Sequence, residues 1–76
     1  MLPLSLDIPR VYVAQRIVEG LRLRGVQSTV EAILPGIDDE WFESVRVDAG
    51  GGLLTVRHPA LLRAIDAEVE SLSSVA

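Results

Sequence analysis

The most informative absences in this chain of 76 residues are those of cysteine and lysine. Without cysteine there is no disulfide, no thiolate nucleophile and no thiolate metal site, and nothing points to an oxidising compartment. Without lysine there is no Schiff-base chemistry and no phosphate-binding lysine of a P-loop. Because no catalytic motif takes their place, we expect a chain that is not an enzyme and that binds no cofactor.

Positive charge is scarce, and all of it is carried by arginine. The formal net charge of −4 argues against a general nucleic-acid binder, since phosphate neutralisation requires a positive field. One alternative stays open, a nucleic-acid-associated regulator that uses a local patch of Arg10, Arg46, Arg57 and Arg63. Any other contact with nucleic acid would be indirect.

Long hydrophobic runs are absent as well. No apolar stretch is long enough to cross a membrane, and the N-terminal residues lack the basic region and the continuous apolar core of a signal peptide. We therefore expect a cytoplasmic protein with no membrane partner.

Two segments have the apolar spacing of amphipathic helices. The first begins around Pro9, after a cap at Asp7 or Ile8, and ends at Gly25. Its buried stripe is expected to consist of Val11, Ala14, Ile17, Val18 and Leu21. The second begins at Pro59, and its stripe is expected to consist of Leu61, Leu62, Ile65, Val69 and Leu72.

Runs of apolar residues, most of them alternating with polar ones, predict strands over residues 2–8, 26–34, 43–48 and 53–57. Pro35-Gly36 and the glycines at 50–52 are typical of turns. Residues 37–44 fit either the first turn of a helix or the tip of a hairpin.

The order of these elements is β-α-β-β-β-α, without a linker or a repeat. A single domain over residues 1–76 with two amphipathic helices is typical of a two-layer arrangement. The sequence therefore predicts an α+β fold, a sandwich in which both helices cover one face of a mixed sheet.

Polar candidates for chemistry are few. His58, the only histidine, has no serine or cysteine nucleophile nearby and is more typical of a capping or surface residue. The acidic run Asp38-Asp39-Glu40 lacks the spacing of a calcium loop. The glycines at 50–52 lead into a predicted strand and not into a helix N-terminus, so they do not form a phosphate loop. We therefore expect no catalytic and no metal-binding residues.

Apolar residues make up 49% of the chain, more than the core of so small a domain buries. Gly20 lies inside a predicted helix at a cost of roughly 1 kcal/mol, which close packing against a strand or a partner would explain. The sequence therefore predicts a non-catalytic protein-interaction module that forms a homodimer or a higher oligomer. The candidate interface residues are Leu61, Leu62, Ile65, Val69 and Leu72, with Trp41 and Phe42 as either a hot spot or core residues. A further alternative is a subunit of a small-molecule-binding oligomer.

Several of these segments follow the pattern of one known family. An initial strand leads through Ile8-Pro9-Arg10 into the helix AQRIVEGL, and a glycine turn and the strand LLTV precede Leu62-Arg63-Ala64. With the apolar stripe that follows, the chain resembles the small dimerising subunit of the KEOPS complex, a family that includes the CTAG antigens. The resemblance implies a non-enzymatic homodimeric adaptor. Such an adaptor would hold a threonylcarbamoyl transferase subunit in a complex that modifies an adenosine of transfer RNA.

Overall fold

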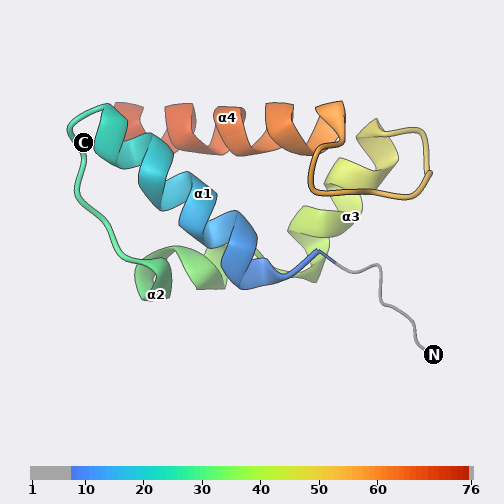
Figure 1. Cartoon of the computed structure of the whole chain (residues 1–76), viewed down its shortest axis with the longest axis horizontal. Helices are drawn as coiled ribbons and strands as arrows, with labels where there is room; N and C mark the ends of the chain where they lie inside the picture. Colours follow the sequence, from blue (N-terminus) through green and yellow to red (C-terminus); the bar gives the residue numbers. More distant parts are fainter. Residues whose placement is uncertain (1–7, 76) are drawn as a thin grey trace.

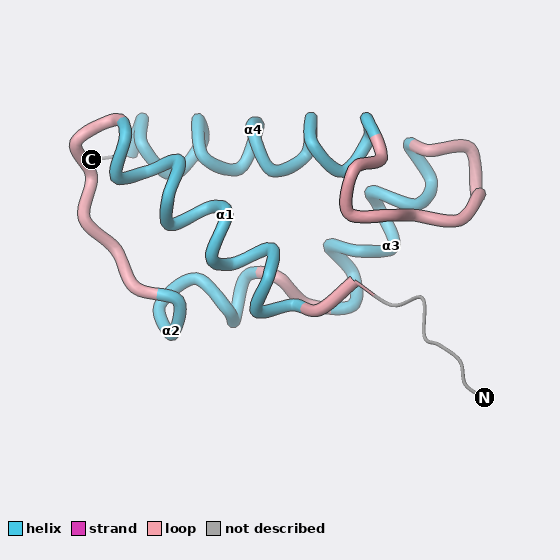
Figure 2. Tube along the Cα trace, viewed as in Figure 1, coloured by secondary structure: helices cyan, strands magenta, loops and turns pink. Residues whose placement is uncertain are grey.

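The computed structural model describes residues 8–75, and within that range the chain is helical (Figures 1 and 2). In chain order the elements are α1 (Arg10–Leu23), α2 (Val30–Ile33), the 3₁₀ helix η1 (Leu34–Gly36), α3 (Asp39–Asp48) and α4 (Pro59–Val75). Residues 8–75 contain no strand, so the predicted α+β sandwich with a mixed sheet is wrong. Most of the predicted first strand, residues 2–7, lies outside the described residues.

Helix α1 confirms the first predicted helix, with Pro9 as its N-cap in place of Asp7 or Ile8. Its end is a Schellman motif: Gly25, at φ +82°, donates to Arg22 O at 3.0 Å and Val26 N donates to Leu21 O at 2.9 Å. Glycine adopts this left-handed conformation without a steric penalty, which confirms the predicted stop. The residues that α1 buries are Val13, Ala14, Ile17 and Leu21, whereas the predicted Val11 is exposed.

The strand predicted over residues 26–34 is wrong, because this segment forms α2 and η1. Thr29 is the N-cap of α2, and its Oγ1 accepts a hydrogen bond from Ala32 N at 3.2 Å. Val30 and Ile33, three residues apart on one helical face, are half-buried, while Ala32 is exposed. The period is therefore that of a helix, and the apparent alternation of apolar residues had no structural meaning.

Residues 37–44, which the sequence left open, contain the start of α3, and the strand predicted over 43–48 is wrong. Asp38 is the N-cap, and its Oδ1 accepts from Trp41 N at 2.9 Å. Carboxylates in the first turn also complement the positive end of the helix dipole. Ile37, just before the helix, and Val45, within it, are both buried in the core. A second Schellman motif, at Gly50 and Gly51, ends the helix.

The strand predicted over residues 53–57 is also wrong, because this segment is the irregular connection between α3 and α4. Within the described part of the chain it has no neighbouring strand with which to form a ladder. Leu54, which is buried, anchors it in the core. A turn in which His58 N donates to Thr55 O at 3.0 Å then leads into α4, which begins at Pro59 as predicted.

The core lies where α1 packs against α4, with α2 and η1 on the other side of α1 from α4 and α3 at the start of α4 (Figure 1). The backbone of Gly20 in α1 touches Val69 of α4 so closely that a Cβ at position 20 would lie 2.8 Å from Val69 Cγ2. This contact explains the glycine by close packing against a helix of the same chain, and not against the strand or the partner that the sequence suggested. The buried core residues are Val13, Ala14, Ile17, Leu21, Ile37, Val45, Leu54, Ala60, Leu61, Ile65 and Val69.

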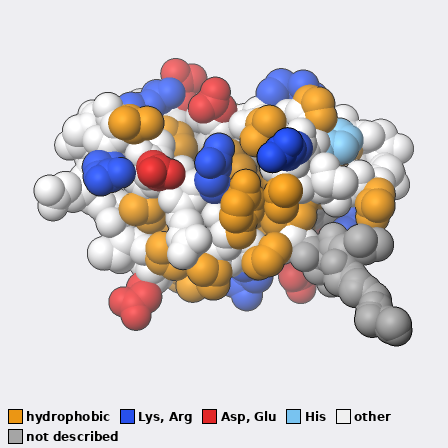
Figure 3. Space-filling view, viewed as in Figure 1, with side chains coloured by type: hydrophobic (Ala, Val, Ile, Leu, Met, Phe, Trp, Pro, Cys, Tyr) orange, Lys and Arg blue, Asp and Glu red, His pale blue; other side chains and the backbone are white. Residues whose placement is uncertain are grey.

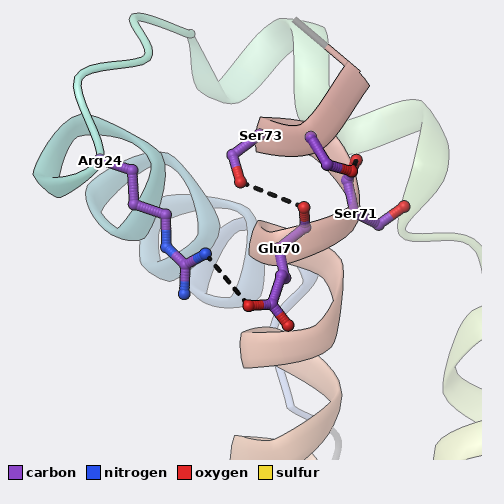
Figure 4. A network of polar contacts seen from close by, with 5 residues as sticks. Arg24, Glu70, Ser71 and Ser73 are labelled. Carbon is purple, nitrogen blue, oxygen red and sulfur yellow. Dashed lines mark hydrogen bonds and ion pairs between the residues drawn. The ribbon is translucent and has the colours of Figure 1, made fainter.

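Polar contacts of two arginines, Arg10 and Arg24, connect elements that are distant in sequence. Arg10 Nε donates to Ile37 O at 2.7 Å, which joins the start of α1 to the segment before α3. At the other end of α1, Arg24 Nη1 lies 3.6 Å from Glu70 Oε2 of α4 (Figure 4). The second pair is largely exposed, so it contributes little to stability.

Candidate functional site

One surface feature of the described residues is a groove between α1 and α4, with a volume of about 390 Å³. Its floor is apolar and is formed by Gly20, Ile65 and Val69. We refer to it as the α1–α4 groove; it is lined by Arg16, Glu19, Gly20 and Leu23 of α1 and by Leu62, Ile65, Asp66 and Val69 of α4. Because position 20 has no side chain, the side chain of Val69 packs directly against the backbone of α1 there.

Two leucines stand on the walls of the groove. Leu23 on α1 is 82% exposed and Leu62 on α4 is 42% exposed. Single exposed leucines are ordinary on a protein surface, and these two lie on different helices on either side of the groove floor. Figure 3 shows apolar side chains across the middle of the face that is viewed in Figure 1, with charged side chains of both signs above, among and below them.

The charges at the rim of the groove are distributed by helix. Arg16 and Glu19 lie on the α1 wall, and Asp66 lies on the α4 wall. Glu19 is already paired with Arg22, three residues along α1, at 3.6 Å. Among the described residues, Arg16 and Asp66 have no ion-pair partner. Counting only the described residues, the groove therefore has one unpaired cation on the α1 wall and one unpaired carboxylate on the α4 wall.

The five residues of α4 that were predicted at an interface differ in how far they are exposed. Leu61 is fully buried in the core, and Leu72 is half-buried. Ile65 and Val69 are buried as well, yet they form the floor of the groove. Leu62 is the member of the predicted α4 set that is exposed.

Trp41 and Phe42 lie on α3, away from the groove. Both are half-buried against the core, and their rings meet edge to face with centroids 5.2 Å apart. This is the arrangement of residues that pack in a core, although Phe42 also lines a second pocket.

The four predicted arginines do not gather at one place. The second pocket, which has a volume of about 420 Å³, is lined by two of them. Arg10 and Arg46 both line it, together with Asp39 and Glu43, whose carboxylates offset the positive charge. The guanidinium of Arg10 is in addition bonded to Ile37 O. The two remaining predicted arginines, Arg57 and Arg63, are exposed and line neither pocket. The nucleic-acid contact stays a prediction, and this placement lends it no support.

His58 is a capping residue, as its sequence context favoured. It is half-buried before α4, and its Nδ1 accepts a hydrogen bond from Ala60 N at 3.1 Å. The ring nitrogen thus satisfies one of the free N–H groups in the first turn of α4. Within the described residues, no three histidine, aspartate or glutamate side chains gather as they would around a metal ion.

The residues of the groove that the sequence did not single out are Arg16, Leu23 and Asp66. Leu23 has one signal, since it is an apolar residue off the predicted buried stripe of α1. Arg16 and Asp66 have none, because they look like any charged residue on a solvated helix face. Only the packing of α1 on α4 brings the three together.

The chain matches no known protein family, no curated protein and no solved structure. None of the helices in the described part of the chain has both the length and the apolar character to cross a membrane. The function has to be argued from the groove itself.

Proposed function

We propose that this chain is a non-catalytic protein-interaction module, a small adaptor that docks a polypeptide in the α1–α4 groove. The observation that carries the proposal is the placement of Leu23 and Leu62 on opposite walls of an apolar floor. Burial of apolar surface drives most protein association, and a fully buried leucine contributes about 1.5–3 kcal/mol. Two such side chains provide the centre of a docking site.

The chemistry of the groove supports binding and not catalysis. Its polar residues, Arg16, Glu19 and Asp66, stand at the rim, where they contact solvent. An apolar centre with a polar rim is the usual anatomy of a protein interface. A general acid or base would need a positioned partner in the site, and the histidine of this chain is engaged elsewhere as a helix cap.

The partner that the family resemblance implies, a threonylcarbamoyl transferase subunit, belongs to this proposal, and so does a cytoplasmic location. Two segments that carry the resemblance support it: AQRIVEGL lies within α1, and Leu62-Arg63-Ala64 lies within α4. These segments contribute to the two walls of the groove. The third segment, LLTV, is a loop, so the proposal rests on the helices alone.

The experiment is a pull-down with tagged chain from the native source at moderate salt, followed by titration of each recovered protein, once purified, against the chain. Leu23→Ser and Leu62→Ser test the groove. Leu53→Ser is the matched control, since Leu53 is 62% exposed and lies outside the groove. We expect both groove variants to weaken binding at least about tenfold, because removal of a buried leucine exceeds about 1.4 kcal/mol.

Equal binding of a recovered protein by the wild-type chain and both groove variants would show that the groove is not the docking surface. Stoichiometric recovery of a threonylcarbamoyl transferase subunit would support that partner. Recovery of the tagged chain alone would contradict that choice of partner.

A further inference from the structure

We propose that His58 makes the first turn of α4 sensitive to pH. The neutral imidazole ring caps this turn, and a ring that takes up a proton releases it. Histidine is the side chain that ordinarily gains its proton between about pH 5 and 8, so mild acidification is enough to operate the cap. The proposal goes beyond the docking of a partner, because it concerns a change within the chain itself.

The hydrogen bond at the start of α4 requires a neutral ring. Ala60 N donates to His58 Nδ1 at 3.1 Å, so Nδ1 carries a lone pair and the single ring proton lies on Nε2. A protonated ring is a donor at both nitrogens and offers Ala60 N no acceptor. Because Ala60 is only 4% exposed, its N–H cannot readily turn to water instead.

The positive charge that the ring gains is unfavourable at this place as well, because the N-terminus of a helix is the positive end of its dipole. The charged residues of the neighbouring elements are Arg46 and Asp48 in the last turn of α3, Arg57 in the connection and Arg63 in the second turn of α4. Among the described residues, no carboxylate lies within ion-pair distance of the ring.

The sign of the pH dependence follows from these contacts. The closed turn holds the ring without its second proton, whereas in the open turn the ring is free to take it up. The open turn therefore binds more protons, and acidification shifts the equilibrium toward it. The cap is fully in place at neutral and alkaline pH and is lost as the pH falls.

The turn that His58 caps belongs both to the core and to the α1–α4 groove. Ala60 and Leu61 are buried, so they hold α4 on the core while the cap is released. Leu62 N donates to His58 O at 3.0 Å, and the Leu62 side chain, which lines the groove, is 42% exposed. Release of the cap thus loosens one wall of the groove. This consequence for docking rests on the proposed function, whereas the cap itself does not.

The test is NMR of the purified full chain at about pH 7.5 and about pH 5.0, which covers the range of histidine. Hydrogen exchange of the Ala60 amide, corrected for the intrinsic effect of pH, gives its protection factor. We expect this factor to fall at least about threefold in acid, as loss of a cap predicts. His58→Asn is the matched variant, because its amide oxygen accepts a hydrogen bond and does not titrate; its protection factor should change less than about 1.5-fold.

The same sample contains a further control. The amide of Ala32 is bonded to Thr29 Oγ1, a cap of similar geometry that takes up no proton, so its protection should stay constant. The ring nitrogen shifts of His58 provide a second readout. At about pH 7.5 they should report the proton on Nε2, and their titration should accompany the loss of protection at Ala60.

Each outcome decides the proposal. A loss of protection at Ala60 that follows the ring titration and is absent from His58→Asn supports it. A ring that carries its proton on Nδ1 at about pH 7.5, or that stays neutral at about pH 5.0, overturns it. Equal losses in the wild type and in His58→Asn also overturn it, because the cause is then elsewhere in the chain. These readouts need no partner, so a failure of docking in the groove leaves them unaffected.

Discussion

Gly20 of α1 and Val69 of α4 are in direct contact, with no space between them for a side chain at position 20. A Cβ added there would lie 2.8 Å from Val69 Cγ2 and 3.3 Å from Val69 Cγ1. Any larger residue must displace Val69, which is buried in the core. The glycine therefore sets both the distance between the two helices and the depth of the groove outside them.

We expect Gly20→Ala to destabilise the protein although alanine is the better helix former. The propensity gain is about 1 kcal/mol, whereas overpacking of a core costs about 1–3 kcal/mol. Urea unfolding should show a net loss. Gly36→Ala is the control, since a Cβ at position 36 meets nothing within 4 Å. In the double variant with Val69→Ala, the alanine at position 20 should cost less than it does alone. A Gly20→Ala protein more stable than the wild type would contradict the contact.

His58→Ala should shorten or fray the start of α4, because it removes the acceptor for Ala60 N. Loss of an N-cap side chain costs about 0.5–2 kcal/mol. His58→Asn is the control, since asparagine is among the best capping residues and should retain most of the stability. Thermal unfolding followed by circular dichroism compares the three proteins. If the asparagine variant is as unstable as the alanine variant, the role of His58 lies in packing and not in capping.

Asp38→Ala should weaken α3 in the same way, by about 1 kcal/mol, because Trp41 N loses its hydrogen bond to Asp38 Oδ1. Asp38→Asn keeps the cap and removes the charge, so its difference from the wild type isolates the dipole contribution and its difference from Asp38→Ala isolates the cap. That contribution is expected to be small, about 0.3–1 kcal/mol, and to decrease with salt. Denaturant unfolding at low and high salt measures both quantities, and equal losses for the two variants would argue against the cap.

Arg10→Met should destabilise the packing of the start of α1 on the segment before α3. Methionine retains an apolar stem but leaves Ile37 O without the donor at 2.7 Å, at a cost of about 1–3 kcal/mol. Arg63→Met, at an exposed position on α4 that lines neither pocket, is the matched control and should change the free energy of unfolding by less than about 0.5 kcal/mol. Similar losses for both variants would indicate a general effect of charge.

The helices that sequence reasoning identified were those that begin next to a proline and carry a long apolar stripe of helical spacing. Pro9 and Gly25 enclose α1, and Pro59 begins α4. At both helices the backbone constraint of a proline or glycine agreed with the helical spacing of the apolar residues, so the local sequence was sufficient to predict the helix.

The strand predictions failed where apolar runs were short. Residues 26–34 and 43–48 each contain apolar residues at alternating positions, and a run of that length does not distinguish a strand from a helix. Local caps mark the start of each helix instead: Thr29 Oγ1 accepts a hydrogen bond from Ala32 N, and Asp38 Oδ1 accepts one from Trp41 N. With helices there, residues 53–57 had no partner among the described residues for a sheet.

The groove was predicted in part. Leu62, Ile65 and Val69 were expected at an interface because they belong to an apolar stripe, and they do line the groove. The other wall depends on which face of α1 meets α4. That pairing arises from contacts between residues roughly fifty positions apart, such as Gly20 with Val69, and no local pattern specifies it.

The edge-to-face pair of Trp41 and Phe42 supplies an optical probe that is independent of assembly. Trp41 is the only tryptophan of the chain, and it lies on α3, outside the α1–α4 groove. Its fluorescence therefore senses the loosening of the core around α3, and the docking of a partner at the groove should leave it nearly unchanged. Emission recorded during a binding titration and during denaturation then reports unfolding separately from binding in an unlabelled protein.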